Sequence, residues 1–102
     1  MADFERREGK LFIDGEEVIR GWESLSGWYW FATKRIGVQD SLIDGKVFRN
    51  DTIWFGFVQG LFEEWGNFSQ TELESIKPVV WEIPSENLPY SGRRQRKAQI
   101  AR

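Results

Sequence analysis

Apolar residues in this chain gather in short runs that end at glycine, proline or acidic residues, and this pattern predicts strands more often than helices. The run Leu-Phe-Ile at residues 11–13 is followed by Asp14-Gly15 and then by residues 16–20. Asp-Gly suits the positive φ angles of a type I′ turn, so these residues are predicted to form a β-hairpin. A second Ile-Asp-Gly stands at residues 43–45. The repeat suggests two similar β units, and chance similarity is the alternative.

Two aromatic runs, at residues 28–33 and 53–59, are predicted to form strands that are apolar on both faces. Side chains alternate along a strand, so one face carries Trp28, Trp30, Ala32, Trp54, Gly56 and Val58, and the other carries Tyr29, Phe31, Thr33, Ile53, Phe55 and Phe57. An antiparallel sheet with both faces apolar needs cover on both sides. The second cover comes either from the chain's own first hairpin together with a loop around residues 35–50, or from another molecule. Gly56 leaves a notch that a ligand or another backbone would fill, or it marks a bulge.

The clearest helix signal is the capping box Ser69-Gln70-Thr71-Glu72. Leu73 and Ile76 mark the predicted buried stripe, and Pro78 ends the helix after little more than two turns. The face with Tyr29, Phe31, Phe55 and Phe57 is predicted to pack beneath Leu73 and Ile76.

A short strand is predicted at residues 79–83, where Pro84 confines its end to an edge of the sheet. The fold class is therefore α+β, a small antiparallel sheet with one short helix. The length of 102 residues suits one domain. We predict this domain at residues 1–90 and a basic tail at residues 91–102.

The tail and the body of the chain carry opposite charge. Residues 91–102 hold five cations and no acid, a charge of +5, whereas the rest of the chain holds nine cations and sixteen acids, a charge of −7. The tail is interpreted as a solvated terminus, as an arm that binds nucleic acid phosphates, or as a segment that folds onto the acidic body or a neighbouring subunit. The candidate nucleic-acid-binding residues are Arg93, Arg94, Arg96 and Lys97.

Composition argues against common forms of catalysis. The chain has six Trp and eight Phe but no His and no Cys, which removes the usual bases, thiol nucleophiles and transition-metal ligands and any disulfide framework. The pairs Glu63-Glu64 and Glu72/Glu74 have spacings unsuited to a carboxylate dyad. We expect no enzyme activity, no cofactor and no metal site.

No apolar run reaches the length of a membrane span, and the first residues lack the layout of a signal peptide. The expected location is the cytoplasm, and no membrane partner is expected.

A family resemblance rests on three segments and a following residue pair. These are Gly27-Trp28-Tyr29-Trp30-Phe31-Ala32-Thr33, Trp54-Phe55-Gly56-Phe57-Val58-Gln59-Gly60 and Glu64-Trp65-Gly66-Asn67-Phe68-Ser69, followed by Glu72-Leu73. The chain resembles a family of short uncharacterised proteins of bacterial genomes and mobile elements, which have an aromatic strand, a Phe-Gly-x-Val-x-Gly strand and a Gly-Tyr-Phe-Ser-x-x-Glu-Leu helix start. Asn67 stands where that pattern has an aromatic residue. More loosely, the chain is similar to small orphan proteins of hyperthermophilic archaeal viruses such as filamentous lipothrixviruses. The resemblance implies an accessory protein of a virus or mobile element, located in the host cytoplasm if viral, and implies no activity.

These patterns predict an interaction protein that binds a peptide segment or a protein partner through an aromatic-lined groove. Aromatic side chains combine a large contact area with low entropy loss on binding. The predicted partner-binding residues are Trp28, Trp30, Trp54 and Trp65. A homodimer interface is a further possibility for the same surface, and a nucleic-acid-binding protein that uses the basic tail is the alternative function.

Overall fold

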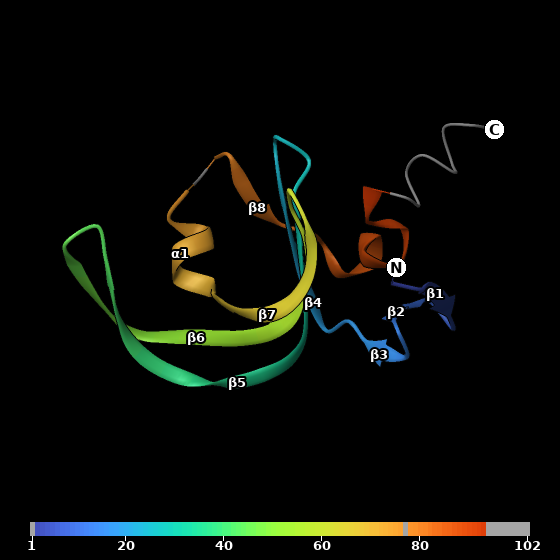
Figure 1. Ribbon diagram of the computed structural model, residues 1–102, viewed down its shortest axis with the longest axis horizontal. Helices are drawn as coiled ribbons and strands as arrows, with labels where there is room; N and C mark the ends of the chain where they lie inside the picture. The colour runs from blue at the N-terminus through green and yellow to red at the C-terminus, as the bar shows by residue number, and fades with distance from the viewer. Residues whose placement is uncertain (1, 77, 94–102) are drawn as a thin grey trace.

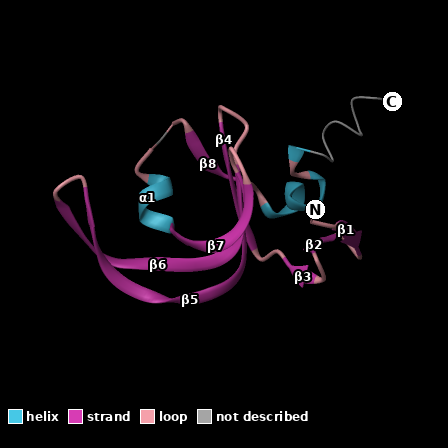
Figure 2. Cartoon of the chain, in the orientation of Figure 1, coloured by secondary structure: helices cyan, strands magenta, loops and turns pink. Residues whose placement is uncertain are grey.

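The computed structural model describes residues 2–76 and 78–93, which form two antiparallel sheets, one short α-helix and one 3-10 helix (Figures 1 and 2). The three-stranded sheet has the order β1 (Phe4–Arg7), β2 (Lys10–Ile13) and β3 (Glu16–Glu17). The five-stranded sheet has the order β7 (Glu63–Ser69), β6 (Lys46–Gln59), β5 (Tyr29–Ile43), β4 (Arg20–Ser24) and β8 (Val80–Glu82). The helices are α1 (Gln70–Glu74) and η1 (Ser85–Tyr90). The predicted α+β fold class is confirmed.

Both predicted Asp-Gly turns are present. Asp14 and Gly15 have φ angles of 50° and 82°, and Asp44 and Gly45 have φ angles of 50° and 77°. The predicted hairpin at the first turn is confirmed, because Ile13 pairs with Glu16 across it. The surroundings differ, since the first turn joins the short strands β2 and β3 whereas the second joins β5 and β6, of 15 and 14 residues. The structure therefore repeats the turn but not the sheet around it.

The long β5–β6 hairpin curls around α1, as Figure 1 shows. Its pairing register shifts at three places, between residues 32 and 34, 35 and 37, and 39 and 41. Each irregularity bends the strands and increases their twist. The curl gives the five-stranded sheet an inner face, which holds α1, and an outer face. The tip of this hairpin projects from the body, and the molecule measures 46 × 25 × 25 Å.

The outer face is covered by the three-stranded sheet and η1. Tyr29, Phe31 and Phe57 from the large sheet share one buried cluster with Leu11, Ile13, Val18, Ile83 and Leu88. Phe4 of β1 packs edge-to-face on Phe31 and Phe57, with ring centroids 5.7 and 5.9 Å apart. The chain's own N-terminal hairpin thus supplies one of the two covers, as one of the predicted alternatives stated. The predicted covering loop at residues 35–50 is wrong, because these residues extend strands β5 and β6 and the turn between them.

The inner face is covered by α1, which corrects the predicted packing. Leu73 joins the cluster of Trp22, Ala32, Trp54 and Val80, so it packs against the tryptophan face and not against Tyr29, Phe31, Phe55 and Phe57. The inclusion of Ile76 in the buried stripe is also wrong, because α1 ends at Glu74 and Ile76 is 45% exposed. The predicted cap is confirmed, since the Glu72 amide donates to Ser69 Oγ at 3.0 Å.

The packed body of the chain extends past residue 90, where the predicted domain ends. Ser91 and Gly92 are buried, and the Arg93 amide donates to Gln59 Oε1 at 3.3 Å. Residues 91–93 of the predicted tail therefore contact the body, and residues 94–102 lie outside the described part of the chain. The predicted edge strand is confirmed, because β8 pairs with β4 at one edge of the large sheet.

Candidate partner-binding surface

The structure keeps three of the four predicted tryptophans together and places Trp65 on the other face of the sheet. Trp54 is buried in the inner core, and Trp30 is half-buried and packs against that core. Trp28 is 39% exposed and lies beside Trp30, with ring centroids 5.9 Å apart. Trp65 is half-buried on the outer face, where it packs against the other core. Trp54 therefore offers no surface to a partner, and Trp65 belongs to a different site from Trp28.

An open depression of about 540 Å³ lies on the outer face around Trp65. Phe55 stacks on Trp65 with a centroid distance of 5.9 Å and an interplanar angle of 18°. Phe57 lies behind Trp65 at 5.3 Å, so core packing fixes the tryptophan ring. Ile36, which is 50% exposed, and Thr33 complete the apolar part of the lining. The depression has a rigid aromatic wall and an exposed aliphatic side chain.

Charged side chains stand at the edge of this depression. Asp14 and Glu16 come from the β2–β3 hairpin, and Lys34 comes from β5. Asp14 Oδ1 accepts the Asp3 amide at 2.8 Å, which holds the carboxylate in place beside the turn. Glu16 is exposed. Two carboxylates and one ammonium group give this edge a net negative charge, which favours a cationic group next to an apolar one.

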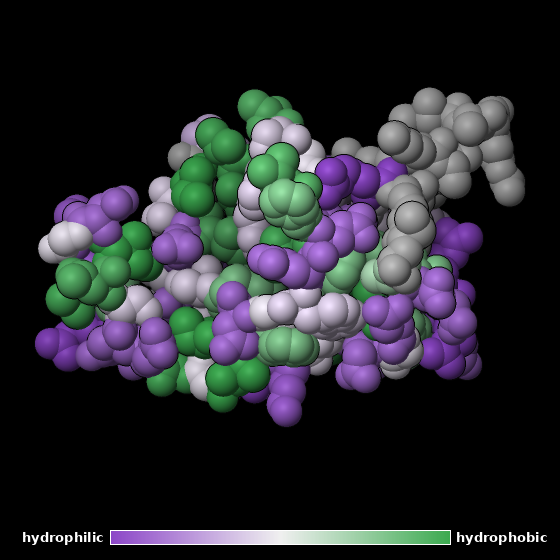
Figure 3. All heavy atoms as spheres, viewed as in Figure 1, coloured by the Kyte–Doolittle hydropathy of each residue, from purple (hydrophilic) through white to green (hydrophobic). Residues whose placement is uncertain are grey.

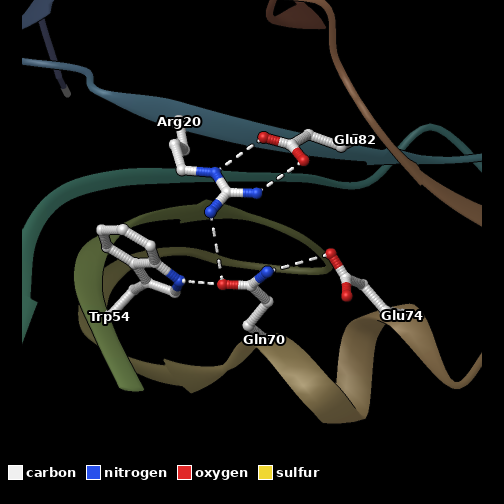
Figure 4. A network of polar contacts seen from close by, with 5 residues as sticks. All are labelled: Arg20, Trp54, Gln70, Glu74 and Glu82. Atoms are coloured by element: carbon white, nitrogen blue, oxygen red, sulfur yellow. Dashed lines mark hydrogen bonds and ion pairs between the residues drawn. The ribbon is translucent and has the colours of Figure 1, made fainter. Parts of the chain in front are cut away.

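A polar network on the inner face involves another sequence-predicted tryptophan (Figure 4). Trp54 Nε1 donates to Gln70 Oε1 at 2.9 Å, and Gln70 Nε2 donates to Glu74 Oε2 at 3.1 Å. Arg20 donates to both carboxylate oxygens of Glu82 at 2.7 and 2.6 Å and reaches Gln70 Oε1 at 3.5 Å. The hydrogen bond with Glu82 raises the pKa of Arg20 above its usual value. The network ties β4, β6, β8 and α1 together, so its evident role is structural.

The described residues hold no group of three or more acidic side chains arranged to bind a metal ion. Within the same residues, no helix combines the length and the apolar character needed to cross a bilayer.

The candidate nucleic-acid residues divide between the body and the residues beyond it. Arg93 Nη2 donates to the Gly60 carbonyl oxygen at 2.6 Å, so this guanidinium holds the end of the body on the turn between β6 and β7. Arg94, Arg96 and Lys97 lie outside the described residues. The nucleic-acid alternative stays a prediction from the sequence.

Sequence reasoning missed most of the depression's lining. Phe55 was predicted to lie on the packed face. It does lie on the same face as Phe57, but it is not part of the buried cluster beneath the three-stranded sheet and lines the depression instead. Ile36 stands between arginine and glycine and carries no periodic signal. Asp14 and Glu16 were predicted to lie in a turn and in the strand that follows it. They come to lie beside Trp65 only because the two sheets pack against each other.

The chain matches no protein-family model, no curated protein and no solved structure. The resemblance to proteins of mobile elements and viruses stays a prediction.

Proposed function

We propose that this protein is a non-enzymatic interaction domain that binds an extended segment of a protein partner in the depression around Trp65. The observation that carries the proposal is the stacked pair Phe55–Trp65, which borders an open apolar hollow in place of being sealed in the core. Preformed aromatic walls of this kind hold an anchoring side chain at little entropic cost. If the resemblance to mobile-element proteins holds, the domain would be an accessory protein.

The chemistry of the depression defines the partner segment. Its lining accepts one large apolar side chain, and the carboxylates of Asp14 and Glu16 favour a Lys or Arg next to that side chain. Residues 1–90 carry a net charge of −7, which also attracts a basic ligand over longer distances. The preferred ligand is therefore an apolar anchor flanked by basic residues.

Strand β7 supports an extended conformation for this ligand. It carries Trp65 and is an edge strand of the five-stranded sheet, with β6 as its neighbour. An extended segment beside β7 would form main-chain hydrogen bonds and direct alternate side chains toward Trp65.

Binding is tested with synthetic octapeptides that carry one central Phe or Leu, flanked in one series by Lys and in the other by Glu. We expect saturable binding, followed by calorimetry, for the Lys series only. Trp65→Ala is expected to weaken it about 30-fold, because a hot-spot aromatic side chain contributes about 2 kcal/mol or more. Trp81→Ala is the matched control, since Trp81 is 38% exposed on β8 and does not line the depression.

A second pair of variants separates binding from stability, because Trp65 also packs against the core. Ile36→Ser is expected to weaken binding about tenfold, through loss of apolar contact, without lowering the melting temperature. Val38→Ser, at a residue 47% exposed on the same strand but outside the lining, is expected to change neither property. Equal effects of Ile36→Ser and Val38→Ser, or equal binding of both peptide series, would contradict the proposal.

A further inference from the structure

The tip of the β5–β6 hairpin carries two strongly exposed apolar side chains. Leu42 is 74% exposed and Val47 is 64% exposed. The two residues pair directly across the strands, so their side chains lie on the same face of the hairpin. We refer to residues 40–49 as the hairpin tip. Figure 3 shows hydrophobic residues beside hydrophilic ones at the left end of the molecule, where Figure 1 places this tip.

Neighbouring charges distinguish the hairpin tip from the other strongly exposed apolar residues. Lys46 precedes Val47, and Arg49 follows it by two residues. In Leu61-Phe62-Glu63-Glu64 two acids follow the apolar pair instead, and Leu25 stands between two serines. Of these three segments, the tip alone combines an apolar side chain with flanking cations, which is the chemistry that the depression around Trp65 favours.

The hairpin tip also carries two acids. Asp40 lies 3.7 Å from Arg49, and Asp44 lies in the turn that joins the two strands. The edge of the depression carries the opposite set of charges, namely two carboxylates and the ammonium group of Lys34. Charges of both signs on the tip therefore find opposite charges at the depression.

The basic and apolar part of the tip has the conformation that the proposed ligand requires. Residues 46–49 belong to β6 and pair with β5, so they are extended. Strand β7 pairs with residues 53–59 of β6, and residues 46–49 lie beyond that pairing. The segment thus projects past β7 as an extended strand.

The hairpin tip points away from the depression of its own copy. The hairpin curls toward the inner face, around α1, whereas the depression lies on the outer face beside the β2–β3 turn (Figure 1). Thr33, Lys34 and Ile36, which line the depression, stand near the base of the same hairpin. Contact between a tip and a depression therefore requires two copies.

We infer that the depression around Trp65 binds the hairpin tip of a second copy of this chain. The inference rests on the proposed function, because it names the partner of the same site. Val47, with Leu42 beside it, supplies the apolar anchor, and Lys46 supplies a cation for the acidic edge. The tip and the depression are different surfaces, so a copy that inserts its tip still offers its own depression to another copy.

Sedimentation equilibrium of the full chain tests this contact between about 10 µM and about 1 mM, because contacts of small area are weak. We expect the average mass of the wild type to rise with concentration. Leu42→Ser/Val47→Ser is expected to weaken association at least about tenfold, through loss of apolar contact. The matched control, Leu25→Ser/Leu61→Ser, removes two side chains that are each 79% exposed at other turns, and it is expected to leave association unchanged.

Mixing two variants tests which surfaces meet. Leu42→Ser/Val47→Ser lacks the apolar tip but keeps the depression, whereas Ile36→Ser weakens the depression but keeps the tip. Each variant alone is expected to stay monomeric at the concentration where half of the wild type is associated. The equimolar mixture is expected to form a dimer and nothing larger, because each pair holds one intact tip and one intact depression. Thermal melting of each variant checks that it folds.

The inference fails if the wild type stays monomeric at about 1 mM or if the Leu25/Leu61 control loses association equally. It also fails if the mixture stays monomeric, since two like surfaces would then form the contact. The octapeptides separate this failure from that of the proposed function. Binding of the Lys series by a wild type that does not self-associate would overturn the inference alone. No octapeptide binding, together with self-association that Ile36→Ser leaves unchanged, would overturn both.

Discussion

Replacing Gly56 with alanine is expected to destabilise the domain by more than about 3 kcal/mol. A Cβ on Gly56 would lie 1.8 Å from the carbonyl oxygen of Phe31 and 2.9 Å from Cα of Ala32. Both are backbone atoms of the neighbouring strand β5, so no side-chain rotation relieves the clash. The two long strands would have to separate where they carry both cores.

Gly66→Ala is the matched control for this variant. Gly66 lies directly opposite Gly56 in the sheet, on β7, and a Cβ there would meet nothing within 4 Å. Its replacement is expected to change stability by no more than about 0.5 kcal/mol. Urea unfolding followed by tryptophan fluorescence measures both variants. A loss in Gly66→Ala as large as that in Gly56→Ala would show that the glycines matter for backbone flexibility and not for close strand approach.

Replacing Asp51 with asparagine is expected to cost about 3 kcal/mol at neutral pH, because hydrogen bonds to a buried charged acceptor are strong. Asp51 is fully buried. Its Oδ2 accepts from Ser41 Oγ at 2.6 Å and from Ser69 Oγ at 2.5 Å, and its Oδ1 accepts the Thr71 amide at 2.9 Å. The carboxylate therefore joins the β5–β6 hairpin to the first turn of α1 and orients the capping serine.

The pH dependence of this loss follows from the pKa of Asp51. Burial raises the pKa, but the hydrogen bonds from Ser41, Ser69 and Thr71 outweigh burial and hold it below the usual value. The ionised group thus stabilises the fold above the unfolded-state pKa of about 4, and this contribution disappears as pH falls through the lower folded-state pKa. The gap between wild type and Asp51→Asn should be largest near neutrality and shrink in acid.

Urea unfolding at a series of pH values checks this expectation. Asp40→Asn is the control, because Asp40 pairs with Arg49 at 3.7 Å on the exposed surface, and exposed pairs contribute little. A gap between wild type and Asp51→Asn that stays constant down to acid pH would mean that the side-chain amide fails for steric reasons and not through loss of the charge.

Local signals in the sequence predicted the local structure well. The Asp-Gly turns, the Ser69 cap and the short edge strand all depend on neighbouring residues, and all are present. Alternation along the aromatic runs also separated the two faces, since Tyr29 and Phe31 lie in one core and Ala32 and Trp54 in the other. These predictions succeeded because residues a few positions apart determine them.

Predictions that depend on distant contacts failed. Alternation shows that a strand has two apolar faces but not which element covers each one, so the positions of α1 and the N-terminal hairpin were exchanged. The depression around Trp65 was missed for the same reason, because the β2–β3 turn and β5 contribute to it across a gap in the sequence. Register shifts along β5, such as that beside Lys34, also change which side chains share a face, and no residue type marks them uniquely.

The order of strands in the large sheet has a consequence for the order in which its pairings form. Strands β4, β5, β6 and β7 each lie beside the strand that is next in the sequence. Strand β8 instead pairs with β4, from which β5, β6 and β7 separate it in the sequence. Pairings between sequence neighbours close short loops and form quickly, and distant pairings are slow because the loop entropy is lost before the contacts form. The four-stranded meander of β4 to β7 can therefore form first, and the pairing of β8 with β4 then adds the final edge.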